Sequence, residues 1–340
     1  MKSNKRPTSK DVAELAGVSR TTVSYVINEK SGGNIRISDE TRRKVLDAVK
    51  KLNYQPDIAA LALRTKRSNL LALMVPHIET PFHPLFASAI QNEIEDSIFD
   101  LIVYGTRDDY QHERTFLDSL IRRGVDGVIT QTFQLTEADL DKLVGNGVAV
   151  VVHGECPTHP YVDNVIFDET QAAREIVTYL VENGHRRIGT VAGPEGTWCG
   201  RLRKEGYLNA LEAAGLAIED ELIVEADFFD RETASHAMRR LLSLPRPPTA
   251  VFVASDEMAV ISLNVAVDME FSVPEDLAIV GFNDIPLAAM VRPRLTTVHK
   301  DIDLLGKTAV KLLLERIDSE VQIPARQVVL GHRIMYRESA

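Results

Sequence analysis

Residues 8–28 read TSKDVAELAGVSRTTVSYVIN, and this stretch contains two short helical patterns in succession. The spacing of its apolar residues predicts a first helix over 10–16, which Ser9 caps and Gly17 ends. After a second cap at Ser19, apolar residues again recur at helical spacing. Two short helices joined by a tight turn that contains glycine have the geometry of a helix-turn-helix.

The outward face of the second helix is polar throughout. A loop rich in Gly, Asn and Ser then leads to Ser38 and a third helix, which turns Val45, Ala48, Val49 and Leu52 inward. Three such helices can close a small core and leave the polar face of the second free to enter a major groove. The side chains on that face are Arg20, Thr21, Thr22, Ser24, Tyr25 and Asn28.

The charge is distributed unevenly along the chain. Residues 1–67 hold 15 Lys and Arg against 7 Asp and Glu, a net charge of +8, whereas the remainder carries 24 against 42, or -18. Because phosphate neutralisation supplies most nonspecific affinity for nucleic acid, a basic head on an acidic body favours DNA as the partner of the head.

The stretch 8–28 resembles the signature of the lactose-repressor (LacI/GalR) family. The runs SDETRRKV at 38–45 and LNYQP at 52–56 continue the resemblance. It extends through most of the remaining chain in five further runs: GHRRI at 184–188, RKEGY at 203–207, ASDEMA at 254–259, VGFND at 280–284 and PRLTTV at 293–298.

The resemblance implies that Arg20, Thr21 and Tyr25 read base edges. Tyr25 stands where most members have arginine, and because tyrosine cannot grip guanine bidentately, the base read there is expected to differ. Residues expected to contact phosphate or to support these contacts are Thr8, Ser19, Ser24, Asn28, Thr41 and Tyr54.

Residues 57–64, DIAALALR, form a short apolar segment that would not be stable as an isolated helix. The resemblance implies a hinge helix that folds on the operator beside its dimer mate and wedges Leu63 into the minor groove. Asp57 and Leu61 replace the usual asparagine and arginine, which removes two favourable groups near phosphate.

From residue 69 onward, short apolar strands alternate with amphipathic helices. This pattern indicates parallel sheets, and because it runs once to about 166 and again to about 290, it predicts two doubly wound subdomains. The expected strands are 70–75, 101–104, 127–130, 148–152, 188–192, 250–254 and 277–280, and segments near 296–314 and 326–336 are expected to cross back between the subdomains.

Ligands of such sheets bind beyond the carboxyl ends of the strands, so two facing subdomains should form a cleft. Arg203 can donate a fork of hydrogen bonds to ligand oxygens, and Asn283, where relatives commonly have aspartate, can both donate and accept. By family position, the residues expected in the cleft are Phe82, His83, Trp198, Arg203, Phe228, Ser255, Asp256 and Asn283.

Other functional classes find little support. The glycines at 193, 196 and 200 lack the Gly-Lys-Ser/Thr of a phosphate-binding loop, and no nucleophile elbow is present. His153, His159, Glu155 and Asp163 lack metal-ligand spacing, and Cys156 and Cys199 are expected to be reduced thiols. No apolar run reaches the 18 or so residues of a membrane span, and the basic N-terminus lacks a signal-peptide core. We therefore expect neither catalysis nor cofactor nor metal, and a cytoplasmic, nucleoid-associated protein.

The sequence thus predicts an all-α helix-turn-helix head and an α/β, type I periplasmic-binding-protein-like body. The expected function is a homodimeric transcriptional repressor of a pseudo-palindromic operator, controlled by a small effector, most readily a sugar. A purine or nucleoside corepressor and, in another class, a pure sugar-binding carrier remain as alternatives. The predicted domains are 1–55 (head), 56–67 (hinge) and 68–340 (body), with one subdomain at about 68–166 and 292–322 and the other at about 167–291 and 323–340.

Overall fold

The chain divides into two compact units, Met1–Ser68 and Asn69–Ala340. The structure, a computed structural model, describes residues 7–27, 37–55 and 67–340. The expected hinge helix and the positions Asn28, Asp57, Leu61 and Leu63 lie outside these ranges.

Three helices form the described part of the head. Short helices of this length cannot persist alone, so their stability comes from a shared apolar core. The helices are α1 (Ser9–Ala16), α2 (Arg20–Ile27) and α3 (Asp39–Leu52), and their buried residues are Val12, Ala13, Val23, Val26, Val45 and Ala48.

The cap of α1 differs from the prediction, because Thr8 and not Ser9 occupies it. Thr8 is extended, its hydroxyl accepts from the Asp11 amide, and its own amide donates to the Asp11 carboxylate at 2.6 Å. If Ser9 were the cap, the third residue of the helix would be Val12, whose side chain cannot accept a hydrogen bond from the cap amide. The capping box, which needs both hydrogen bonds, therefore forms at Thr8. The other predicted signals are confirmed: Gly17 ends α1 with φ 66°, and Ser19 and Ser38 cap α2 and α3.

The body contains two six-stranded sheets whose strands pair in parallel, except that β12 is antiparallel to β10. The first has the order β11-β5-β4-β3-β1-β2 and the second β12-β10-β9-β8-β6-β7. The strands of the first are β1 (Leu70–Val75), β2 (Asp100–Gly105), β3 (Gly127–Thr130), β4 (Ala149–His153), β5 (Asp163–Phe167) and β11 (Gln327–Leu330); those of the second are β6 (Ile188–Ala192), β7 (Ile223–Glu225), β8 (Ala250–Val253), β9 (Ala278–Asn283), β10 (Thr296–Lys300) and β12 (His332–Met335).

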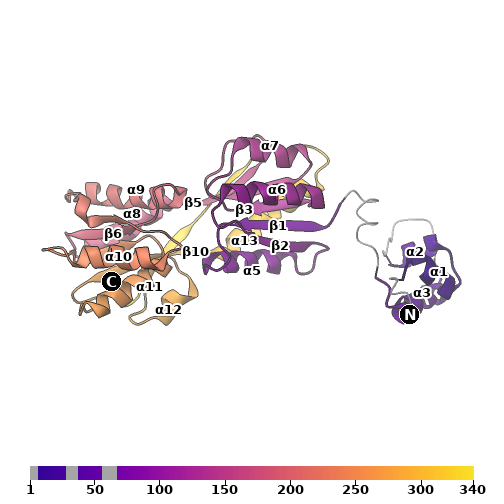
Figure 1. The fold of residues 1–340 in the computed structure, drawn as a ribbon, viewed down its shortest axis with the longest axis horizontal. Helices are drawn as coiled ribbons and strands as arrows, with labels where there is room; N and C mark the ends of the chain where they lie inside the picture. Colours follow the sequence, from indigo (N-terminus) through magenta and orange to yellow (C-terminus); the bar gives the residue numbers. More distant parts are fainter. Residues whose placement is uncertain (1–6, 28–36, 56–66) are drawn as a thin grey trace. The chain divides into compact units, whose positions relative to one another are not determined.

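Helices cover both faces of each sheet, which gives two three-layered lobes (Figure 1). The first lobe has α5 (Phe82–Ile94) and α13 (Ile302–Asp318) on one face and α6 (Tyr110–Arg123) and α7 (Glu137–Gly145) on the other. The second lobe has α8 (Glu169–Glu182) and α9 (Trp198–Ala213) opposite α10 (Arg231–Leu242), α11 (Asp256–Asp268) and the short α12 (Pro286–Met290), with a 3-10 turn at Asp220–Leu222. No helix in the described part of the chain is long and apolar enough to span a membrane.

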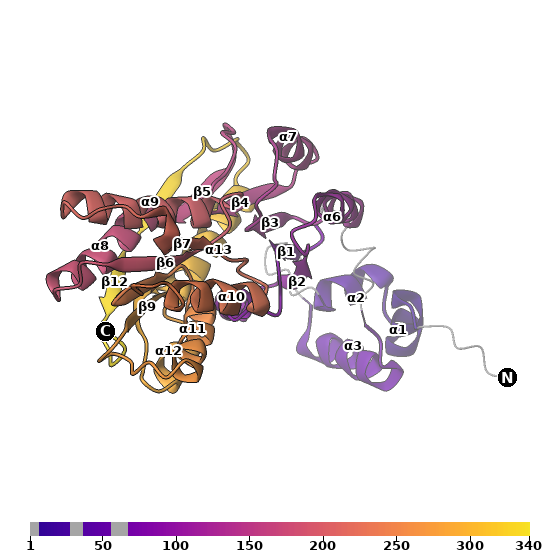
Figure 2. The same ribbon diagram turned by 60° about the vertical axis from the view of Figure 1, so that its left-hand side comes forward.

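The chain passes between the lobes three times, and the last segments, coloured yellow, appear in both (Figures 1 and 2). The predicted subdomain limits are wrong here: β10 pairs with β9 in the second lobe, and β11 pairs with β5 in the first. The assignment of 292–300 to the first subdomain and of 323–330 to the second is therefore reversed. Alternation along the chain shows that a strand exists but not which sheet it extends, because pairing partners are remote in sequence.

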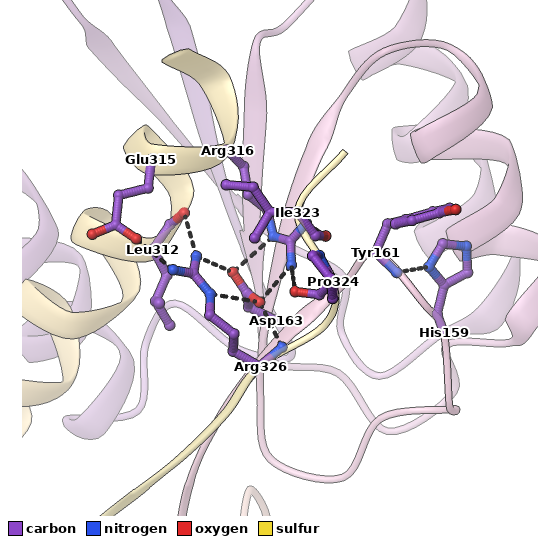
Figure 3. A network of polar contacts seen from close by, with 9 residues as sticks. All are labelled: His159, Tyr161, Asp163, Leu312, Glu315, Arg316, Ile323, Pro324 and Arg326. Atoms are coloured by element: carbon purple, nitrogen blue, oxygen red, sulfur yellow. Dashed lines mark hydrogen bonds and ion pairs between the residues drawn. The ribbon is translucent and has the colours of Figure 1, made fainter. Parts of the chain in front are cut away.

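Asp163, at the start of β5, fixes the connection between α13 and β11 (Figure 3). Its fully buried carboxylate accepts from Arg316 Nε at 2.7 Å and from Arg326 Nη2 at 2.8 Å, and Arg316 also donates to the Ile323 carbonyl. The two guanidinium groups hold the pKa of Asp163 below its usual range, although burial opposes this. Asp163 therefore has a structural role.

Candidate nucleic-acid interface and ligand pocket

Helix α2 presents the polar face that the sequence predicted. Arg20 and Thr21 are exposed and Ser24 and Tyr25 are half-buried, while Val23 and Val26 on the opposite side fill the core of the head. The helix thus offers side chains of different hydrogen-bonding capacity on one surface, as base readout in a major groove requires.

Four further residues that the sequence analysis assigns to phosphate contacts or their support lie among the described residues of the head. The hydroxyls of Thr8 and Ser19 accept helix-capping bonds, and Thr41 and Ser38 share a hydrogen bond of 2.9 Å between their hydroxyls. Tyr54 is half-buried against the core of the head. Thr8 and Ser19 thus cap helix ends, Thr41 bonds the cap residue of α3, and Tyr54 packs on the core, so each has a structural role.

A pocket that is partly open to solvent lies between the two lobes of the body, and the empty space it encloses together with the solvent at its mouth amounts to about 610 Å³. Its walls come from the carboxyl ends of strands in both sheets and from the helix starts that follow them, where parallel sheets bind ligands. All eight residues predicted for the effector line it: Phe82, His83, Trp198, Arg203, Phe228, Ser255, Asp256 and Asn283.

Arg203 is a buried residue that lines the pocket, and it belongs to an ion cluster. Its Nε donates to Glu169 Oε2 at 2.7 Å, and Lys300 Nζ donates to Glu169 Oε1 at 2.7 Å. Burial alone would raise the pKa of Glu169, but the two cations lower it to about 2, so the carboxylate is ionised. Glu169 begins α8 just after the first crossing between the lobes, and Lys300 ends β10 just before the second.

Both carboxylate oxygens of Asp256 are engaged by hydrogen bonds within the protein. One carboxylate oxygen accepts from the Ile285 amide at 2.8 Å and the other from the Thr297 hydroxyl, and burial raises the pKa of Asp256 to about 6. It thereby fixes the end of β9 and the loop that follows; at that end Asn283 has φ 113°. Asn283 Oδ1 accepts a long, 3.5 Å bond from Arg203 Nη2.

Aromatic rings from both lobes close around the pocket. Phe228 packs so tightly on Gly193 that a Cβ there would lie 2.1 Å from its ring. Phe229 stacks on His77 of the opposite lobe, with ring centroids 4.0 Å apart. Such rings can cover the apolar face of a flat ligand.

His83 and His153 are both buried and neutral. The His83 Nδ1 lies 2.6 Å from the Thr80 hydroxyl, and burial lowers the pKa of His83 to about 4. His153 Nδ1 lies 2.8 Å from the Val165 carbonyl and must be its donor, while burial lowers the pKa of His153 to about 3. Neither group is charged at neutral pH.

Sequence reasoning missed several pocket residues. Phe229 adjoins the predicted Phe228, and Lys300 closely follows the PRLTTV run, so proximity to those motifs was the available signal. Gln131 directly follows the predicted strand 127–130. In the described part of the chain, the Gln131 Oε1 and Trp198 Nε1 atoms are buried without a partner, so these two pocket residues can offer an acceptor and a donor to ligand hydroxyls. The other residues missed are Thr80, Pro81, Phe133, Cys199, Glu257 and Ile285.

Two family models match parts of this chain. The family model described as bacterial regulatory proteins, lacI family, matches residues 8–57, and that of a periplasmic binding protein-like domain matches 177–340. The ribose operon repressor of Escherichia coli (strain K12) is 34% identical, over 98% of this chain and 99% of its own. Catabolite control protein A of Priestia megaterium is 32% identical, over 97% and 98% respectively.

Two solved structures are similar over almost the full length. The lac repressor dimer bound to operator and the anti-inducer ONPF has a TM-score of 0.86 at 27% identity, covering 98% of this chain and 99% of its own. A complex of the transcriptional regulator CelR with cellobiose has a TM-score of 0.74 at 32% identity, covering 98% and 100%.

Proposed function

This chain belongs to the lacI family of bacterial regulatory proteins, and from that premise we propose that it is a homodimeric repressor whose effector is a sugar or sugar derivative. It is a DNA-binding transcriptional regulator with a ligand-binding body. The operator is a pseudo-palindrome, because a two-fold dimer presents two identical α2 helices to it. The protein acts in the cytoplasm, at the nucleoid, and no catalytic step belongs to this function.

The observation that carries the proposal is the combination of an exposed polar α2 face with a pocket that contains all eight predicted effector residues. Arg20, Thr21 and Tyr25 read bases, and Thr8, Ser19, Ser24 and Thr41 support contact with phosphate. The residues that contact the effector include Arg203, Asn283 and Trp198. The alternative of a pure sugar-binding carrier is disfavoured, because the basic head would have no function in such a protein.

A polyhydroxylated ring fits the chemistry of the pocket. Arg203 and Asn283 offer hydrogen bonds, and Phe82, Phe228 and Trp198 offer flat apolar faces. A purine or nucleoside corepressor is the second candidate. It is favoured by the same aromatic rings and by relatives named transcriptional repressor PurR, one of which, from Actinobacillus pleuropneumoniae serotype 3 (strain JL03), is 32% identical over 91% of this chain and 91% of its own.

Dimerisation is supported by apolar side chains exposed on the body. Ile98 and Val103, beside and within β2, are 70% and 42% exposed, and Met290 on α12 is 71% exposed. Burial against a second copy would remove these groups from water.

Selection of bound duplexes from random DNA with the full-length protein tests the regulator and its symmetry. We expect enrichment of a pseudo-palindrome; enrichment of a single half-site would contradict the dimer. Titration calorimetry with panels of neutral sugars and of purines then tests the effector. Binding of purines alone would overturn the sugar assignment and leave the regulator intact.

A further inference from the structure

Two cations reach the effector pocket, and a single carboxylate holds both. Arg203, Lys300 and Glu169 are 4%, 3% and 1% exposed, so their ion cluster is shielded from water and salt. Both ion pairs measure 2.7 Å, and each Glu169 oxygen serves one cation. The carboxylate therefore directs both positive charges away from the pocket and toward itself.

The remaining donors of these cations are partly committed as well. Arg203 Nη1 donates to the Ala254 carbonyl at 2.6 Å and its Nη2 to Asn283 Oδ1 at 3.5 Å. Of the five N–H groups of an arginine, two remain for a ligand. The Lys300 ammonium lies 5.1 Å from the centre of the Phe82 ring and 4.7 Å from that of Phe167.

Two further carboxyl groups, those of Asp256 and Glu257, line the same pocket. Together with Glu169, the site therefore contains three acidic groups and two cations. An anion entering the pocket would be desolvated without meeting an unpaired cation, which is costly. A hydroxyl needs only one donor or acceptor and can use the two free N–H groups of Arg203.

We propose that Glu169 makes the pocket select an uncharged effector and reject the phosphorylated or acidic form of the same molecule. This inference rests on the proposed function, because it concerns the effector of the same cleft. Glu169 acts through Arg203 and Lys300 and is a positioning residue.

The only tryptophan of the chain, Trp198, lines the pocket and can report its charge before any effector is known. The full-length protein is titrated with iodide and with caesium at constant ionic strength, and the ratio of their quenching constants is measured. In Glu169→Gln this ratio should rise on the order of tenfold, because both cations lose their counter-charge. Neutral acrylamide should quench both proteins alike.

Lys300→Met should change the ratio of quenching constants in the opposite direction. This variant also tests the proposal if Glu169→Gln does not fold. It leaves one glutamate paired with one arginine, and the iodide-to-caesium ratio should fall. Asp163→Asn is the matched control, because it also removes a buried carboxylate from between two cations (Figure 3), and Asp163 is not among the residues that line the pocket. An unchanged ratio in both pocket variants, or an equal change in Asp163→Asn, would overturn the proposal.

Calorimetry with matched compounds supplies the second readout. Each neutral sugar is compared with its uronic acid and its phosphate ester, against the natural protein and Glu169→Gln. We expect the natural protein to bind only neutral members and the variant to gain acidic ones. Tighter binding of an acid by the natural protein would refute the charge selection yet leave a carbohydrate-controlled regulator. If no carbohydrate binds, the sugar assignment fails while the quenching ratio still decides the role of Glu169.

Discussion

The indole ring of Trp198 lies directly on the backbone of Gly154. Gly154 follows β4 in the first lobe and Trp198 begins α9 in the second, so this contact joins the two lobes beside the pocket. A Cβ at Gly154 would come within 2.3 Å of Trp198 Cζ2. Only glycine allows the ring this close approach, and Gly154 also has φ 102°, which other residues rarely adopt.

Gly154→Ala should separate the two lobes at this point. We expect the emission of Trp198 to shift to longer wavelength and effector affinity to fall. Gly184→Ala is the control, since Gly184 has φ 94° but a Cβ added there would meet no heavy atom within 4 Å. Both variants should lose about 1 to 3 kcal/mol of stability from backbone strain, measured by urea unfolding, and Gly154→Ala should lose more. Equal losses and equal emission would show that the contact is unimportant.

Arg203→Ala should abolish the response to effector while operator binding without effector persists. The variant leaves Glu169 paired with Lys300, so the buried cluster becomes neutral and folding is retained. Operator affinity is measured by fluorescence anisotropy with and without effector. Arg187→Ala is the control, because Arg187 pairs with Glu219 and Glu221 in the same lobe, outside the pocket. Loss of operator binding by Arg203→Ala would mark a purely structural arginine.

Arg20→Ala and Tyr25→Ala should each cost about 1 to 3 kcal/mol of specific binding and alter the preferred base at one position in each half-site. Selection from random duplexes with each variant measures both effects. Lys10→Ala, at an exposed position on α1, should weaken binding evenly across sequences. If base preference stayed the same at every position for both α2 variants, the placement of the reading helix would be wrong.

His153 should make the protein less stable in acid. Its pKa is about 3 in the folded protein and 6.5 in the unfolded chain, so below pH 6.5 the unfolded chain binds a proton that the folded protein does not. Stability is therefore lost as pH falls from 6.5 toward 3. The free energy of unfolding in urea is measured for the natural protein and for His153→Gln at pH 7 and at pH 5. The amount by which the natural protein is more stable should decrease by about 2 kcal/mol between these two pH values. A constant difference would mean that His153 is not kept neutral by burial.

Glu113 should have the opposite effect. It is 2% exposed on α6, and burial, assisted by the charge of Asp108, raises its pKa to about 7. Because this exceeds the unfolded value of 4.5, stability is lost as pH rises from 4.5 through 7. At pH 8 the free energy of unfolding of Glu113→Gln, measured in urea, should therefore exceed that of the natural protein by about 2 kcal/mol. This difference should disappear by pH 5. Asp118→Asn, in a surface pair with Lys142, should change little at either pH.

The pocket residues were predictable where they belong to runs that resemble the lactose-repressor family. Arg203, Ser255, Asp256 and Asn283 lie inside such runs, and the structure places all of them in one pocket. Glu169 was not predictable, because its importance comes from Lys300, which is 131 positions away. Burial and pairing of these charges depend on which strands end beside each other.

The sequence by itself determined the local elements. The strands 127–130 and 188–192 have the predicted bounds, and the helices of the head follow from caps and valine spacing, because these signals act between residues a few positions apart. The tertiary structure alone decided that β10 joins the second sheet and β11 the first, that Trp198 rests on Gly154, and that one carboxylate holds two cations under the pocket. These relationships arise from strand pairing and lobe packing between remote segments, which no local pattern encodes.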